Sequence, residues 1–119
     1  KPTALSPEGR DAASAEGDII TLADVSQQVP VVRAKIKTRS PVRALAYSPD
    51  GKLLAAGSDR DVSLFDAATG KQILSFQHGN GASQSVQFSP DGSQLTVTTA
   101  TGAQLLLEAR TGRLIKVSK

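Results

Sequence analysis

A four-residue turn motif returns along this chain at a nearly constant interval. The tetrapeptide Ser-Pro-Asp-Gly occupies residues 48–51 and again residues 89–92, 41 residues later, and a near copy with Glu in place of Asp occupies residues 6–9, 42 residues earlier. A second turn signal, Thr69-Gly70, returns 42 residues on as Thr111-Gly112. Two independent turn signals that keep one period indicate that a structural unit of about 40 residues is repeated three times within these 119 residues.

Each repeat predicts four short strands joined by tight turns. In the second repeat the apolar runs lie at residues 42–47, 53–56, 62–66 and 73–76. In the first turn Pro presets φ, Asp bonds the local backbone, and Gly51 takes the left-handed conformation. Ala68-Thr69-Gly70 is a three-residue hairpin signal with the glycine in the left-handed region. The third repeat follows the same pattern, the first has a more polar and Ala-rich second strand, and no segment has a sustained helical period.

The repeat length and its strands predict an all-β fold built from propeller blades. Repeats of roughly 40–45 residues with four strands are typical of β-propellers. We therefore expect three four-stranded antiparallel blades at residues 1–38, 39–80 and 81–119, as parts of one propeller domain. The small residues Ala55 and Ala56 predict close packing between neighbouring blades, and Gly57-Ser58-Asp59 predicts the next turn.

Residues 42–59 and 62–70 resemble a WD40 repeat almost throughout. Phe65-Asp66 matches the Trp-Asp dipeptide of that family, and His78 lies where the family has its histidine. Asp59 matches the turn aspartate that, in the family, joins a hydrogen-bond network with that histidine and a Ser or Thr. The other repeats have Leu22-Ala23 and Leu107-Glu108 at the dipeptide position, and the chain has no Trp.

The turn signals and the resemblance together assign a structural role to eight residues. They are Asp59, Phe65, Asp66, His78, Gly51, Gly70, Gly92 and Gly112.

Three blades do not make a closed ring, since propellers typically have four to eight. We expect two terminal faces rich in Leu, Val and Ala that need a neighbour. Two copies could form a six-bladed ring, another chain could supply the remaining blades, or the chain could be an excised or engineered fragment. The chain lacks Met and begins with Lys1-Pro2, so we expect that it is not a complete translation product.

The resemblance implies a non-enzymatic protein-interaction scaffold with a protein or peptide partner at the ring face. Two alternatives stay open: a self-assembling module with no ligand beyond itself, and an accessory propeller segment of a larger enzyme. With no Cys and one His the chain cannot supply a zinc site. The spacing of Asp59, Asp61 and Asp66 does not match a calcium-binding EF-hand loop, and no phosphate-binding loop is present. We therefore expect no catalytic residue, cofactor or metal.

A run of alternating basic residues is the candidate partner surface. Arg33, Lys35, Lys37 and Arg39 would project on one side of an extended strand, and Arg43 and Arg60 lie in nearby loops. Such charges also protect an edge strand from aggregation, which is the competing interpretation. The net charge of +3 and an aromatic content of 3% do not favour a nucleic-acid partner.

The sequence leaves the compartment open. No apolar run reaches the ~18–20 residues that a membrane-spanning helix needs, and no signal peptide is visible. We expect no membrane partner, and the absence of Cys does not assign a compartment.

Overall fold

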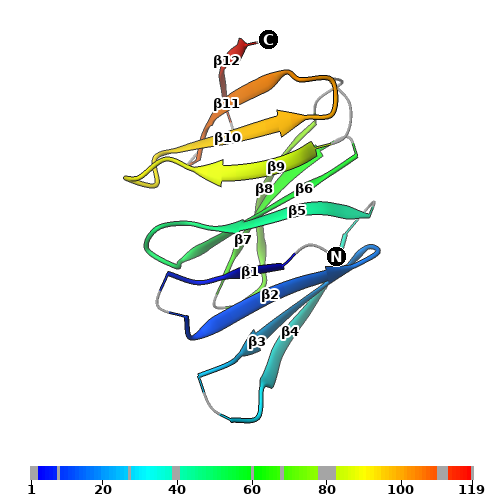
Figure 1. The fold of residues 1–119 in the computed structure, drawn as a ribbon, viewed down its shortest axis with the longest axis vertical. Coiled ribbons are helices and arrows are strands. Elements are labelled where there is room, and N and C mark those ends of the chain that lie inside the picture. The colour runs from blue at the N-terminus through cyan, green and yellow to red at the C-terminus, as the bar shows by residue number, and fades with distance from the viewer. Residues whose placement is uncertain are drawn as a thin grey trace.

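Twelve strands form three separate four-stranded antiparallel sheets in the computed structural model (Figure 1). It describes residues 3–7, 9–26, 28–38, 41–59, 61–67, 69–77, 83–109 and 113–118. Among these residues all regular structure is strand, and none forms a helix that is long and apolar enough to cross a membrane. The predicted all-β fold of three four-stranded blades is confirmed.

Each sheet keeps its strands in chain order. The first sheet contains β1 (Thr3–Leu5), β2 (Asp11–Glu16), β3 (Ile19–Asp24) and β4 (Val31–Lys37). The second contains β5 (Val42–Tyr47), β6 (Leu53–Ser58), β7 (Asp61–Asp66) and β8 (Gln72–Gln77). The third contains β9 (Ser83–Phe88), β10 (Gln94–Thr99), β11 (Gln104–Glu108) and β12 (Leu114–Ser118). The sheets lie one above another along the 43 Å long axis, with β1 against β5 and β5 against β9 (Figure 1).

The repeated tetrapeptide forms the same hydrogen-bonded turn each time. Gly51 N–H donates to the carbonyl of Ser48 at 2.9 Å, and the φ of Gly51 is 74°, in the left-handed region. The Ser48 hydroxyl donates to Asp50 Oδ1 at 2.5 Å and accepts from the Leu53 N–H at 3.0 Å. Equivalent hydrogen bonds form from residues 89 to 94, where Gly92 has a φ of 76°. The turn is held by bonds within six residues, so its geometry follows from local sequence.

The second sheet is covered on both faces, and this places the core. Its β5, β6 and β7 contribute to two clusters of buried apolar side chains, one against each neighbouring sheet. The cluster with the first sheet contains Ala13, Ala15, Ile20, Leu22, Ile36, Val42, Leu54, Ala56 and Phe65. The cluster with the third sheet contains Ala44, Ala55, Val62, Leu64, Val86, Leu95, Val97, Leu105, Leu107 and Ala109.

Gly57 in β6 sets the closest approach between the second and third sheets. A Cβ atom at this position would lie 2.7 Å from Ser83 Cβ and 3.0 Å from Val86 Cγ1. These distances are shorter than an ordinary van der Waals contact of 3.4–4 Å. The small residue is therefore required by the neighbouring sheet. The sequence predicted a turn at Gly57-Ser58-Asp59, but β6 continues through Ser58, so that expectation was wrong for Gly57 and Ser58.

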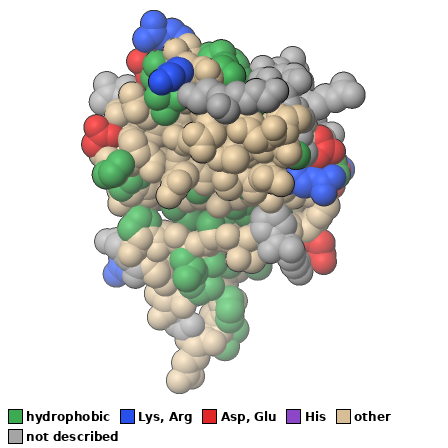
Figure 2. Space-filling model, turned by 45° about the horizontal axis from the view of Figure 1, so that its top comes forward, with side chains coloured by type: hydrophobic (Ala, Val, Ile, Leu, Met, Phe, Trp, Pro, Cys, Tyr) green, Lys and Arg blue, Asp and Glu red, His purple; other side chains and the backbone are tan. Residues whose placement is uncertain are grey.

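The outward face of the third sheet is not the Leu-, Val- and Ala-rich face that we expected. The cross-strand pairs Thr96↔Leu106 and Thr98↔Gln104 face away from the second sheet, because the alternate residues Leu95 and Val97 are buried against it. Figure 2 turns this end of the molecule toward the viewer, and most of the surface there is neither hydrophobic nor charged. On this face Thr96, Thr98 and Gln104 present polar groups to water, whereas the faces that meet another sheet inside the molecule are apolar.

Candidate interaction site between the first and second sheets

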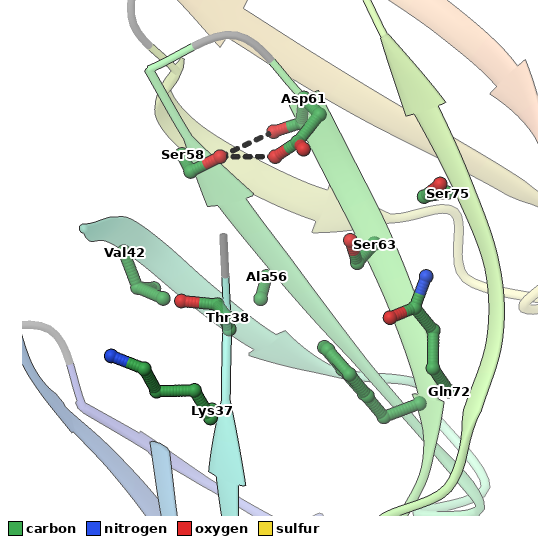
Figure 3. Close-up of a pocket in the computed structure, with 10 residues that line it drawn as sticks. Lys37, Thr38, Val42, Ala56, Ser58, Asp61, Ser63, Gln72 and Ser75 are labelled. Carbon is green, nitrogen blue, oxygen red and sulfur yellow. Dashed lines mark hydrogen bonds between the residues drawn. The ribbon is translucent and has the colours of Figure 1, made fainter. Parts of the chain in front are cut away.

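A crevice of about 50 Å³ lies between the first and second sheets, at the end of β4 and along β7 and β8 (Figure 3). Its floor is apolar and contains Val42, Ala56 and Phe65. Its outer wall carries Ser63, Gln72 and Ser75 from β7 and β8. We call this site the serine crevice.

The serine crevice exists because hydroxyl groups replace aliphatic side chains. Ser63 and Ser75 are a cross-strand pair on the face of the second sheet that meets the first. The equivalent pair in the third sheet is Leu105 and Val117, and Leu105 is buried in the core. Two serines fill less volume than a leucine and a valine, so the space between the sheets stays open at this point.

The charged groups at the rim are already paired. Lys37 Nζ contacts the Asp18 carboxylate, and this hydrogen bond holds the pKa of Asp18 below its usual value. The Ser58 hydroxyl contacts the Asp61 carboxylate and lies 3.2 Å from the Asp61 carbonyl oxygen. Figure 3 shows the two Ser58–Asp61 contacts at the mouth of the crevice.

The wall of the serine crevice, in contrast, has unused polar groups. Within the part of the chain that the structure describes, the hydroxyls of Ser63 and Ser75 and the carboxamide of Gln72 make no hydrogen bond. These neutral donors and acceptors can bind an incoming polar group.

A second, wider crevice lies at the opposite ends of the strands. It has a volume of about 330 Å³ and is lined by Asp11, Arg33, Gly51, Lys52, Asp66 and Ala67. Arg33 Nη1 lies 2.7 Å from Asp11 Oδ1, so the first sheet supplies a paired acid and base. We call this site the charged crevice.

Tyr47 is close to this acid–base pair. Its hydroxyl is buried and has no hydrogen-bond partner among the residues that the structure describes. Burial, and secondarily the Asp11 carboxylate, raises the pKa of Tyr47 to about 12.

The basic residues of β4 that the structure describes lie in different places. Arg33 lies in the charged crevice and Lys37 in the serine crevice, and Lys35 between them is exposed. A register shift between Leu22 and Ala23 interrupts the regular pairing of β4 near Arg33.

The sequence interpretation also missed the acids that pair with these residues. Arg43 Nε donates to Asp59 Oδ1 at 2.8 Å, and this bond raises the pKa of Arg43. Together with Asp11 and Asp18, Asp59 therefore compensates one of the candidate cations. Arg39 and Arg60 lie outside the described residues. A sequence signal for Asp18 was its place in a two-residue turn between β2 and β3, where it faces the end of β4.

Several residues assigned to the structural motif lie within the described part of the chain. Phe65 is 2% exposed in the core, and Asp66 Oδ1 accepts from the Thr69 N–H at 3.2 Å. Gly70 has a φ of 78°, as predicted for its turn. His78 and Gly112 lie outside the described residues, so the hydrogen-bond network of Asp59 with His78 stays a prediction.

The described residues contain no group of three or more His, Cys, Asp or Glu side chains placed to hold a metal ion.

Comparisons with known proteins agree with this architecture. Residues 31–66 match the family described as WD domain, G-beta repeat. The chain is 32% identical over 81 residues to Minichromosome loss protein 1 of Schizosaccharomyces pombe, covering 67% of this chain and 10% of that protein. It is 35% identical over 91 residues to Autophagy-related protein 18 of Meyerozyma guilliermondii, covering 72% of this chain and 16% of that protein.

A WD repeat-containing protein of Synechocystis is 33% identical over 100 residues, which cover 76% of this chain and 28% of that protein. The chain thus spans about a tenth to about a quarter of the length of these relatives. Three four-stranded sheets with the repeated turn and these matches show that the chain belongs to the WD40-repeat family of β-propeller proteins.

Proposed function

We propose that this chain is a non-enzymatic protein-interaction scaffold whose partner docks over the serine crevice. The observation that carries the proposal is the pairing of an apolar floor with unused hydroxyl and carboxamide groups on Ser63, Gln72 and Ser75. WD40 repeats in general serve protein interaction, and the family membership supports this class of function.

The size of the crevice favours a polypeptide over a small molecule. Sites for drug-sized ligands have volumes of roughly 300–1,000 Å³, whereas the serine crevice has about 50 Å³. This volume suits one side chain of a partner that lies across the outer edges of the two sheets. The wall groups would bond to its polar end or to the flanking main chain, which adds specificity.

The basic residues have a secondary part in this proposal. Arg33, Lys37 and Arg43 are paired with acids, so a partner would gain little from them. Lys35 is the described cation of β4 without an ion pair, and Arg39 and Arg60 remain candidate partner contacts. Lys35 pairs with Thr21 on the outward face of the first sheet, so it does not line the serine crevice, and it would act on an acidic partner through its charge.

Displayed random peptides selected on the purified chain provide the test. Changing Ser63→Leu together with Ser75→Val installs the side chains of the third sheet and fills the serine crevice. We expect selected peptides to lose about tenfold or more in affinity for this variant, because burial of one anchor is typically worth more than ~1.4 kcal/mol. Thr96→Val on the outward face of the third sheet is the matched control, and it should leave binding unchanged.

Peptide binding that is equally strong after the crevice is filled would refute the proposal. Lys35→Glu tests the basic contribution separately, because an acidic peptide should then bind more weakly at low salt but not at high salt.

The same proposal includes completion of the ring by further blades. Each blade of a propeller packs against two neighbours, and here the first and third sheets each pack against one. A second copy of this chain or another chain would supply the missing neighbours. Native mass spectrometry distinguishes the two, since a homodimer would have twice the mass of 12.3 kDa.

A further inference from the structure

The outward face of the third sheet differs from the faces that meet a following sheet inside the molecule. The cross-strand registers align the positions of the three sheets one by one. At four equivalent positions the first sheet has Ala13, Ala15, Ile20 and Leu22, the second has Ala55, Gly57, Val62 and Leu64, and the third has Thr96, Thr98, Gln104 and Leu106.

Thr98 has a direct steric consequence. Its equivalent Gly57 faces Ser83 and Val86 so closely that even a Cβ atom would lie 2.7 Å from Ser83 Cβ. Thr98 adds a Cβ and two further heavy atoms at that position. A neighbour that packed on the third sheet as the third packs on the second would overlap these atoms, so this face requires a neighbour with smaller facing side chains.

The outward face of the first sheet has the smaller side chains that are needed. At four equivalent positions the second sheet has Leu54, Ala56, Ser63 and Phe65, the third has Leu95, Val97, Leu105 and Leu107, and the first has Ala12, Ser14, Thr21 and Ala23. On the innermost strands, Val86 of the third sheet corresponds to Thr3 of the first, since Val86 pairs with Val97 and Thr3 with Ser14. Threonine has as many side-chain heavy atoms as valine, so Thr3 adds a hydroxyl group, and the reduction in volume comes from the four positions of the middle strands. The face of the first sheet is thus reduced in volume while that of the third is enlarged.

The two faces also match in chemistry. Thr96, Thr98 and Gln104 need hydrogen-bond partners when a neighbour buries them. The apolar face of an ordinary blade offers none, whereas Ser14 and Thr21 of the first sheet offer hydroxyl groups. Both the volumes and the polar groups are therefore complementary.

We infer that the outward face of β9–β12 is the docking surface for the outward face of β1–β4 from a second copy of this chain. This inference rests on the proposed ring closure and names its partner. Thr98 of one copy then contacts Thr3 of the other, in the place where Gly57 faces Val86 within the chain. Reciprocal contacts of this kind close a ring of two copies.

Disulfide trapping on the intact chain tests the inference, because the native sequence has no Cys. A Thr98→Cys chain is mixed with a Thr3→Cys chain in a glutathione redox buffer, and the cross-linked dimer is measured on a non-reducing gel. The control mixes Thr98→Cys with Val29→Cys, which places the second thiol on a residue that is 73% exposed in the β3–β4 turn. We expect a cross-link for the first mixture and not for the control.

A second variant measures the complementarity itself. Thr96→Ala with Thr98→Gly gives the third sheet the residues of the second, Ala55 and Gly57. We expect self-association, measured by sedimentation, to weaken about tenfold or more, because the shape match is lost. Circular dichroism confirms that this variant stays folded, and Thr96→Ser with Thr98→Ser is the conservative control that should keep the dimer.

The outcomes separate this inference from the proposed scaffold role. A chain that stays monomeric at all concentrations, or a dimer that cross-links no better than the control, overturns the docking inference and leaves this face to a blade of another chain. Peptide binding at the serine crevice would survive either result. Loss of peptide binding with an intact cross-link would instead refute the scaffold role alone.

Discussion

Replacing Gly57 by Ala tests whether contact between the second and third sheets limits the size of this residue. The added Cβ would lie 2.7 Å from Ser83 Cβ, which is 0.7 Å closer than the 3.4 Å lower end of ordinary contact. Gly57 does not have a positive φ, so the substitution meets no backbone strain. The cost is therefore steric, and overpacking of this kind typically destabilises by ~1–3 kcal/mol.

Part of that cost is offset in the unfolded chain, because Ala has less backbone freedom than Gly, which contributes ~0.4–1 kcal/mol. The net expectation is a loss of ~1–2 kcal/mol in the free energy of unfolding, or about 4–8 °C in Tm for a chain of this length. Urea unfolding followed by far-UV circular dichroism, at one fixed protein concentration, measures the loss.

Ser83→Gly in the same chain removes the opposing Cβ and provides the control. We expect the double variant Gly57→Ala with Ser83→Gly to lose clearly less stability than the sum of the two single variants, which a double-mutant cycle detects. A Gly57→Ala variant as stable as the native chain, or additive losses in the cycle, would refute the steric explanation.

Four further expectations concern buried and turn residues. Phe65→Ala should destabilise the chain by ~3–5 kcal/mol in urea unfolding, because Phe65 is 2% exposed in the core, and Phe65→Leu should cost less; equal losses would contradict a packing role. Tyr47→Phe should leave stability unchanged or raise it by up to ~1 kcal/mol, because the buried hydroxyl has no partner within the described part of the chain, and a clear loss would reveal one. Ultraviolet absorbance should give the Tyr47 phenol a pKa of about 12. The folded chain holds this proton more tightly than the unfolded chain, so stability should fall as the pH rises from ~10 toward 12. The Ser89 hydroxyl lowers the pKa of Asp91 to about 2. The ionised Asp91 carboxylate therefore stabilises the folded chain above pH ~3.9, and this stabilisation is lost as the pH falls through about 2. A carboxyl NMR titration that gives Asp91 an ordinary pKa would contradict this expectation.

The fold follows from local chemistry that the sequence displays directly. Ser48, Asp50 and Gly51 close a turn by hydrogen bonds within six residues, and the same residue types recur in each repeat. Strand positions follow from the turns, which is why the twelve strands could be predicted without any long-range information.

The candidate site could not be predicted in the same way because it depends on contacts between sheets. Ser63 alternates with Val62 and Leu64, so the pattern suggests that it faces water. In a sheet that is covered on both sides, the alternate residues face a neighbouring sheet instead, and Ser63 leaves a crevice there. The pairing of Arg33 with Asp11 likewise depends on the register shift in β4, which no sequence signal announced.

The double coverage of β6 has a consequence for how the molecule opens. From Leu54 to Ser58 every residue of this strand is buried, while β4 and β12 are largely exposed at the outer edges of their sheets. Amide hydrogens of β6 should therefore exchange with solvent only when the second sheet separates from both of its neighbouring sheets. Those of the outer strands should exchange through local fraying. Protection should decline outward from the middle of the chain toward both ends, so the second blade acts as the cooperative unit on which the other two depend.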